Sequence, residues 1–98
     1  MEYKLISGKD LEDNLENYFI IDARTKEEYD EGHVPGSINI PHEEVLNHIR
    51  KTKTNKPLAM YCRSTRRSEY AADILTLAGF NDITIAPGVG LYDYKMTK

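Results

Sequence analysis

The only cysteine of this 98-residue chain, Cys62, stands among residues that could support chemistry. The apolar run 58–61 precedes it and is typical of a buried strand. Three arginines follow within five residues, namely Arg63, Arg66 and Arg67. A helical pattern of apolar residues begins directly afterwards. The pattern therefore predicts that a strand, a short loop and the start of a helix meet at one thiol.

A thiol in this position is expected to react as a nucleophile. The start of a helix presents unpaired N–H groups and the positive end of the helix dipole, and both stabilise an anion. The three arginines add positive charge, so Cys62 should ionise more readily than a free cysteine. The alternative is a structural cysteine, because free cysteine is among the most buried residue types. A structural thiol gains nothing from three flanking arginines, which favours the reactive interpretation.

Three stretches of the sequence resemble the rhodanese domains, which are sulfurtransferases that carry sulfur as a cysteine persulfide. The segment 62–68, Cys-Arg-Ser-Thr-Arg-Arg-Ser, is similar to the active-site loop of that family. Asp22-Ala23-Arg24 follows an apolar run. The segment 32–41, Gly-His-Val-Pro-Gly-Ser-Ile-Asn-Ile-Pro, is the most specific match of the three. The resemblance covers nearly the whole chain.

The resemblance implies a double displacement at Cys62. Its thiolate would attack the outer sulfur of a small anionic donor such as thiosulfate and become a persulfide. The outer sulfur would then pass to cyanide, a small thiol or a protein thiol. The loop amides would surround the anionic sulfur as an oxyanion hole surrounds developing charge. The expected substrate-binding residues are those of the loop: Arg63, Ser64, Thr65, Arg66 and Arg67.

Three further residues are expected to support the loop. Asp22 and Arg24 lie at the carboxyl end of a predicted strand, the edge at which open α/β sheets bind ligands. They are expected to form a salt bridge with each other or with the loop, and direct contact with substrate is the alternative. Ser68 is expected to cap the following helix, and Arg67 to clamp the loop from within. No cofactor and no metal are expected.

Two other functions remain open from the sequence. A cysteine-dependent phosphatase or arsenate reductase needs five residues between its cysteine and its arginine, because a tetrahedral oxyanion must fit inside the loop. Here Arg67 follows Cys62 after four residues and Ser68 takes the next position, which makes a smaller loop suited to one sulfur atom. A non-catalytic rhodanese-like binding module is the second alternative. Such modules usually lack the cysteine that this chain keeps.

The chain departs from the rhodanese pattern at two places. Thr65 stands where glycine is usual, and a β-branched residue resists the left-handed backbone that a tight loop often requires. Near its end the chain has Gly88-Val89-Gly90 and no tryptophan, whereas the family has a Gly-Gly pattern followed by tryptophan. Tyr92 or Tyr94 is expected to take over that packing role.

Charge and composition limit the partners. Thirteen basic and sixteen acidic side chains give a net charge of −3, which disfavours nucleic acid and anionic membranes. A single cysteine excludes an internal disulfide, and three scattered histidines make a zinc site improbable. The sequence shows no signal peptide and no apolar run long enough to span a membrane. We therefore expect a cytoplasmic monomer.

The order of short apolar runs and helical patterns predicts one α/β domain over residues 1–98. We expect a rhodanese-like fold with a five-stranded, mostly parallel sheet and helices on both faces. Strands are predicted at 3–6, 18–21, 37–40, 58–61 and 83–85. Helices are predicted after Ser7, at 26–31 behind a Thr25–Glu28 capping box, at 43–51 and after the cysteine loop. His33 is expected to be a packed or hydrogen-bonded loop residue, and His42 and His48 are expected to be surface residues.

Overall fold

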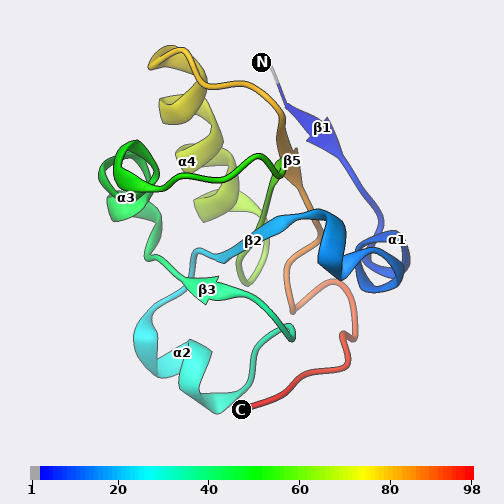
Figure 1. Ribbon diagram of the computed structural model, residues 1–98. Coiled ribbons are helices and arrows are strands. Elements are labelled where there is room, and N and C mark those ends of the chain that lie inside the picture. The colour runs from blue at the N-terminus through cyan, green and yellow to red at the C-terminus, as the bar shows by residue number, and fades with distance from the viewer. Residues whose placement is uncertain (1–2) are drawn as a thin grey trace.

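The computed structural model describes residues 3–98 and contains one five-stranded sheet in which every strand pairing is parallel (Figure 1). The strands are β1 (Lys4–Leu5), β2 (Phe19–Asp22), β3 (Ile38–Asn39), β4 (Leu58–Tyr61) and β5 (Ile83–Ile85). Their order across the sheet is β1-β5-β4-β2-β3, so β4 lies at the centre. The five predicted strands are confirmed, and a mostly parallel sheet proves to be parallel throughout.

The connecting helices cover both faces of the sheet, as predicted. They are α1 (Gly8–Asp13), α2 (Lys26–Glu31), α3 (Val45–Lys51) and α4 (Arg66–Leu77), with short 3-10 helices η1 (Leu15–Asn17) and η2 (His42–Glu44). Helices α3 and α4 lie together on one face, and α1 lies on the other (Figure 1). Within the described residues, no helix is both long and apolar enough to cross a membrane.

Local signals in the sequence set several of these helix ends. The Ser7 hydroxyl accepts a hydrogen bond from the Asp10 amide at 3.0 Å at the start of α1. Thr25 and Glu28 form the predicted capping box, and α2 has the predicted bounds. The predicted helix 43–51 begins instead as a 3-10 turn before α3. At the end of α4, the Gly79 and Phe80 amides bond back to the last-turn carbonyls, which closes the helix.

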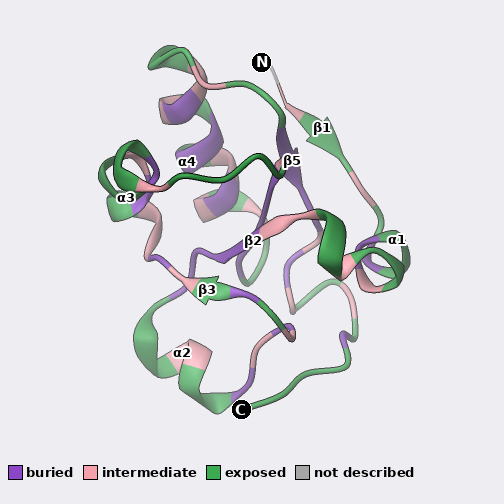
Figure 2. Cartoon of the chain, in the orientation of Figure 1, coloured by how far each residue is buried: buried purple, intermediate pink, exposed green. Residues whose placement is uncertain are grey.

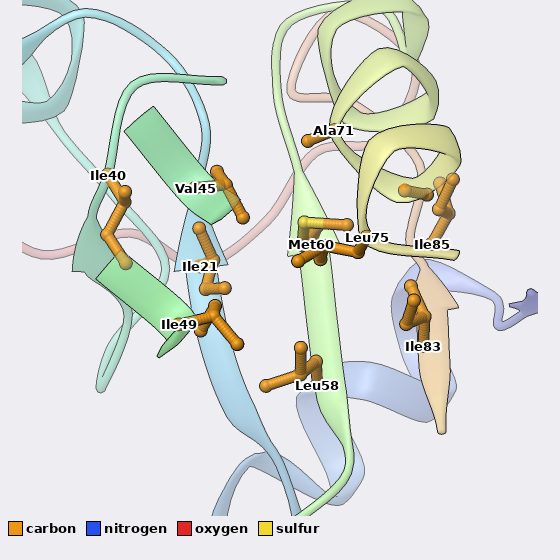
Figure 3. Packing of buried hydrophobic residues seen from close by; sticks show 11 residues of the cluster. Ile21, Ile40, Val45, Ile49, Leu58, Met60, Ala71, Leu75, Ile83 and Ile85 are labelled. Atoms are coloured by element: carbon orange, nitrogen blue, oxygen red, sulfur yellow. The ribbon is translucent and has the colours of Figure 1, made fainter. Parts of the chain in front are cut away.

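Alternating residues of the central strands build two apolar layers. Ile21, Leu58 and Met60 point towards α3 and α4 and pack against residues such as Val45 and Leu75 (Figure 3). On the opposite face, Ile20, Ala59 and Tyr61 pack with Leu11 of α1, Val34 and Tyr94. All four residues of β4 are buried, so this strand lies at the core of the molecule (Figure 2). Cys62, the residue that follows β4, is therefore attached to a fully buried strand.

His33 is packed and hydrogen-bonded and His48 is exposed, as predicted, whereas His42, predicted at the surface, is half-buried. The His33 ring stacks on Tyr29, with centroids 3.7 Å apart, and its Nδ1 lies 2.9 Å from the Tyr29 carbonyl oxygen. His42 is half-buried and meets the edge of the Tyr70 ring, and His48 is exposed. The backbone of His33 also pairs with Thr97 in a short antiparallel bridge. That bridge fixes the last part of the chain beside the end of α2.

Candidate active site

Cys62 directly follows β4, at the carboxyl edge of the sheet. The neighbouring strand β2 ends at Asp22, which pairs in register with Tyr61. Cys62 has no exposed surface. Cys62 is therefore a fully buried residue at the start of the loop that joins β4 to α4.

The backbone amides that follow the cysteine have no acceptor. Within residues 3–98, none of the amides of 63–68 donates a hydrogen bond to a backbone or side-chain group; the first bond of the new helix runs from Glu69 to the Thr65 carbonyl at 2.8 Å. Three of these amides belong to Arg66, Arg67 and Ser68, the first residues of α4, where the amides have no acceptor within the helix. A run of six free donors beside a thiol therefore forms a site for an anion, as successive amides do in other anion-binding loops.

The segment 88–90 fixes the direction in which the first of these amides point. Val89 donates its amide to the Cys62 carbonyl at 2.9 Å, and Gly90 donates to the Arg63 carbonyl at 2.8 Å. In a trans peptide the C=O and the next N–H point in opposite directions. Because the two carbonyls face the 88–90 segment, the amides of Arg63 and Ser64 point away from it.

Gly88 allows the 88–90 segment to lie directly against the Arg63–Ser64 peptide. A Cβ on this glycine would overlap the Arg63 carbonyl group and would lie 2.6 Å from the Ser64 nitrogen. Only a residue without a side chain allows the two backbones to come this close. The Gly88-Val89-Gly90 segment is thus a wall of the loop, although it departs from the family's usual glycine pattern.

Thr65 has a positive φ angle, the conformation that a β-branched residue was expected to resist at this position. Its φ of 146° and ψ of −16° lie in a region that residues with a Cβ seldom occupy. Thr65 is also the N-cap of α4, but its side chain makes no capping hydrogen bond. The loop therefore holds a strained residue at the point where glycine is usual in the family.

The prediction that Ser68 caps the following helix was wrong. Helix α4 begins at Arg66, so Ser68 lies inside its first turn. Its side chain is fully buried, and its hydroxyl has no hydrogen-bond partner among the described residues. The error arose because the unusual backbone of Thr65 starts the helix earlier than the side-chain pattern indicated.

The arginines of the loop divide into two kinds. Arg67 forms a two-pronged ion pair with Glu28 of α2, with nitrogen–oxygen distances of 2.9 and 3.2 Å. These hydrogen bonds from Arg67 lower the pKa of Glu28 to about 2. Arg63 and Arg66 are exposed, and neither forms an ion pair within the described part of the chain. Arg67 therefore ties the loop to α2, while the other two charges remain available at the surface.

Asp22 and Arg24 form the mutual salt bridge that was one of the sequence-based alternatives. The two side chains are buried, and the shortest nitrogen–oxygen distance is 2.7 Å. Asp22 also accepts a hydrogen bond of 2.6 Å from the Tyr61 hydroxyl, and Arg24 donates to the Gly32 carbonyl. Burial, together with the Asp22 carboxylate, raises the pKa of Tyr61. The network anchors the residue that immediately precedes Cys62.

The two C-terminal tyrosines, Tyr92 and Tyr94, both pack against other parts of the fold; that they replace the family's tryptophan stays a prediction. The Tyr92 ring lies directly over Gly8, where a Cβ would overlap it, and its hydroxyl donates to Glu12 at 2.9 Å. Tyr94 is buried against Tyr61. Together the rings hold the segment that forms the wall of the loop against α1.

Three residues of the site were not identified from the sequence: Glu28, Tyr61 and Gly88. Glu28 was predicted only as half of a capping box, and Tyr61 only as an apolar strand residue. The hydrogen bonds that place them in the site, Tyr61 to Asp22 and Arg67 to Glu28, each join positions 39 residues apart. No local pattern carries that information. For Gly88, the only signal in the sequence was the nearby Gly90, which indicates a turn but not a contact with the cysteine loop.

The fold and the site together define a class of protein: a parallel α/β domain in which a buried thiol is followed directly by a run of backbone amides without acceptors. A family model described as a rhodanese-like domain matches residues 7–93. The chain belongs to the rhodanese-like family.

Individual relatives agree with this assignment. "Thiosulfate sulfurtransferase PspE" of Escherichia coli (strain K12) is 38% identical over 80 residues, which cover 80% of this chain and 75% of the relative. "Putative sulfur carrier protein YrkF" of Bacillus subtilis (strain 168) is 36% identical over 89 residues. That match covers 90% of this chain but 48% of the relative, so the chain spans about half of that protein's length.

Among solved structures, a rhodanese-related protein from Thermoplasma volcanium has a similar fold throughout. It superposes with a TM-score of 0.83 at 27% identity, covering 97% of this chain and 98% of that one. Relatives of moderate identity are thus thiosulfate sulfurtransferases and a protein named as a sulfur carrier.

Proposed function

We propose that the protein is a sulfurtransferase that carries one sulfur atom as a persulfide on Cys62. The observation that carries the proposal is the run of six backbone amides without acceptors beside the only cysteine. Such donors stabilise negative charge on a thiolate and, after sulfur uptake, on a persulfide. The family and the named activities of several relatives support the same reaction.

The first half-reaction forms the persulfide. The Cys62 thiolate attacks the outer sulfur of thiosulfate or of another persulfide donor. A new sulfur–sulfur bond forms at Cys62, the donor's own sulfur–sulfur bond breaks, and sulfite leaves with the electron pair when thiosulfate is the donor. No proton is transferred, so the step needs no general base. Because Cys62 has no exposed surface, the loop must move to admit the donor's outer sulfur.

The second half-reaction returns the cysteine to its starting state. A nucleophilic acceptor, such as cyanide or a thiolate of a small molecule or protein, attacks the outer sulfur. The sulfur–sulfur bond to Cys62 breaks and the thiolate leaves. The chain has no second cysteine, so the acceptor must come from outside it.

The loop residues take distinct roles in this proposal. The amides of Arg63, Ser64, Thr65, Arg66 and Arg67 hold the anionic sulfur. The exposed side chains of Arg63 and Arg66 attract the anionic donor. The Arg67 side chain is engaged by Glu28, which favours a clamping role over contact with an oxyanion and argues against the phosphatase alternative. Asp22 and Arg24 support the strand end beneath the loop. A cytoplasmic location stays a prediction from the sequence.

Intact mass spectrometry after incubation with thiosulfate tests the proposal. The wild-type protein should gain the mass of one sulfur atom, and Cys62→Ser should gain none while keeping its far-UV circular dichroism spectrum. The same substitution should abolish sulfur transfer from thiosulfate to cyanide. Undiminished transfer by the variant would refute the assignment. Failure of the wild type to take up sulfur would favour a binding module, and Cys62-dependent hydrolysis of aryl phosphates would favour a phosphatase.

A further inference from the structure

A buried hydroxyl without a partner lies in the first turn of α4. The Ser68 side chain is fully buried, and its Oγ makes no hydrogen bond within residues 3–98. Leaving a buried hydroxyl unpaired is unfavourable, because its hydrogen bonds to water are lost without replacement. A serine inside a helix often bonds to the carbonyl four residues earlier, but no such bond to Ser64 is formed here. An unpaired group of this kind in a native protein calls for an explanation.

The position of Ser68 puts this hydroxyl at the end of α4 that is nearer the cysteine. Four residues of α4 are buried, and Ser68 is the first of them, ahead of Ala71, Ala72 and Leu75. The later three pack on the core that includes Met60 of β4. Helical side chains lean towards the helix N-terminus. Ser68 therefore lies at the end of this face nearest the carboxyl tip of β4, where Cys62 follows.

We propose that the Ser68 hydroxyl donates a hydrogen bond to the anionic outer sulfur of the Cys62 persulfide. The inference rests on the proposed function and adds a side-chain donor to the five amides that hold the anionic sulfur there. The hydroxyl has no partner in the sulfur-free protein, and sulfur uptake brings a second, charged sulfur atom into the loop. Hydrogen bonds to charged acceptors are about twice as strong as neutral ones. The bond therefore forms on sulfur uptake and is lost on discharge.

This proposal separates the two half-reactions. A donor that bonds to the persulfide but not to the free thiol favours persulfide formation and stabilises the state from which discharge starts. Ser68→Ala should slow sulfur uptake from thiosulfate about ten-fold, the effect of one such hydrogen bond. Discharge of the preloaded variant by cyanide should be unchanged or faster. General damage to the loop would slow both steps.

The protein offers a matched control in the same helix. Thr76 carries the other buried hydroxyl without a partner in the described residues, and it lies near the far end of α4. Thr76→Ala should leave both half-reactions unchanged. Single-turnover release of sulfite measures uptake, and formation of thiocyanate from the loaded protein measures discharge.

Thermal unfolding gives an independent readout. Sulfur-free Ser68→Ala should be at least as stable as the wild type, because it removes an unpaired buried hydroxyl. The rise in Tm on sulfur loading should be smaller in Ser68→Ala than in the wild type and in Thr76→Ala. A variant that takes up sulfur at the wild-type rate with the full rise in Tm would refute the inference, as would equal slowing of both half-reactions. A wild type that takes up no sulfur would instead refute the proposed function itself.

Discussion

Thr65 shows at the scale of one residue how the loop is kept in an unfavourable shape. A residue with a Cβ at a φ of 146° carries strain, and such backbone costs of order 1–3 kcal/mol. The strain persists because the residues on either side are fixed, by the 88–90 segment before it and by α4 after it. The shape of the loop thus depends on contacts outside the loop itself.

Replacing Thr65 by glycine should therefore stabilise the protein. Relief of the backbone strain outweighs the extra freedom that glycine gives the unfolded chain, which costs about 0.5–1 kcal/mol. We expect Thr65→Gly to raise the free energy of unfolding by about 1 kcal/mol. Urea denaturation followed by circular dichroism measures the change.

Two variants control for this effect. Thr65→Ala keeps a Cβ and should gain little, because the strained φ remains. Ser64→Gly changes a neighbour whose φ is not positive, and it should destabilise the protein slightly. A Thr65→Gly protein no more stable than Thr65→Ala would show that the backbone at this position is not strained.

At the scale of elements, the segment after β5 acts as the wall that orients the loop amides. It holds two loop carbonyls by hydrogen bonds, and it is itself held by the Tyr92 ring over α1. The loop is thus fixed from two sides of the sheet, because α4 packs on one face and α1 on the other (Figure 1).

Gly88→Ala should disturb this wall. The new methyl group would overlap the Arg63 carbonyl, and overpacking of this kind costs about 1–3 kcal/mol. Displacing the Arg63–Ser64 peptide would also turn the Ser64 amide away from the thiol, so sulfur transfer to cyanide should fall about 10²-fold. Steady-state thiocyanate formation and urea denaturation measure the two effects.

Gly90→Ala provides the graded comparison. A Cβ there would lie 3.0 Å from the Arg63 oxygen, a contact that a small shift can relieve. Its losses in stability and rate should both be smaller than those of Gly88→Ala. Equal effects of the two substitutions would mean that close approach at Gly88 is not what fixes the loop.

Elements with a local signal could be predicted from the sequence, and contacts between distant elements could not. The Thr25–Glu28 box gave α2 its bounds, and the apolar run 58–61 gave β4. The start of α4 was missed because the strained backbone at Thr65, and not a side-chain cap, begins that helix. The position of the Cys62 loop between β4 and α4 was predicted because its residues are contiguous in the sequence. Glu28 and Gly88 were missed because their contacts exist only after folding.

At the scale of the whole molecule, the Glu28–Arg67 pair joins α2 to the start of α4 across 39 residues of sequence. Both side chains are about three-quarters buried, with exposed fractions of 22% and 28%. The pair links the cysteine loop to the part of the fold that follows β2. Its charge state should therefore affect the stability of the whole protein.

The direction of this effect follows from the lowered pKa of Glu28. The carboxyl group has a pKa of about 2 in the folded protein, against an ordinary value of 4.5. A lowered pKa contributes stability that is fully present above about pH 4.5 and is lost as the pH falls towards 2. Partial exposure screens the pair, so its contribution at neutral pH should be about 1–2 kcal/mol.

Glu28→Gln should reveal this contribution as a pH-dependent difference in stability. The variant keeps a side-chain oxygen for the capping box but loses the charge that pairs with Arg67. Its free energy of unfolding should be about 1–2 kcal/mol below that of the wild type near pH 6. This difference between the two proteins should narrow as the pH falls from about 4.5 to 3, because Glu28 of the unfolded wild-type chain then gains a proton. Urea denaturation at several pH values measures the difference.

Glu27→Gln provides the control. Glu27 is an exposed neighbour on the same helix and has no ion pair in residues 3–98, so its substitution should produce a much smaller difference in stability. A Glu28→Gln gap that stays constant from pH 6 to pH 3 would show that the ion pair does not stabilise the fold.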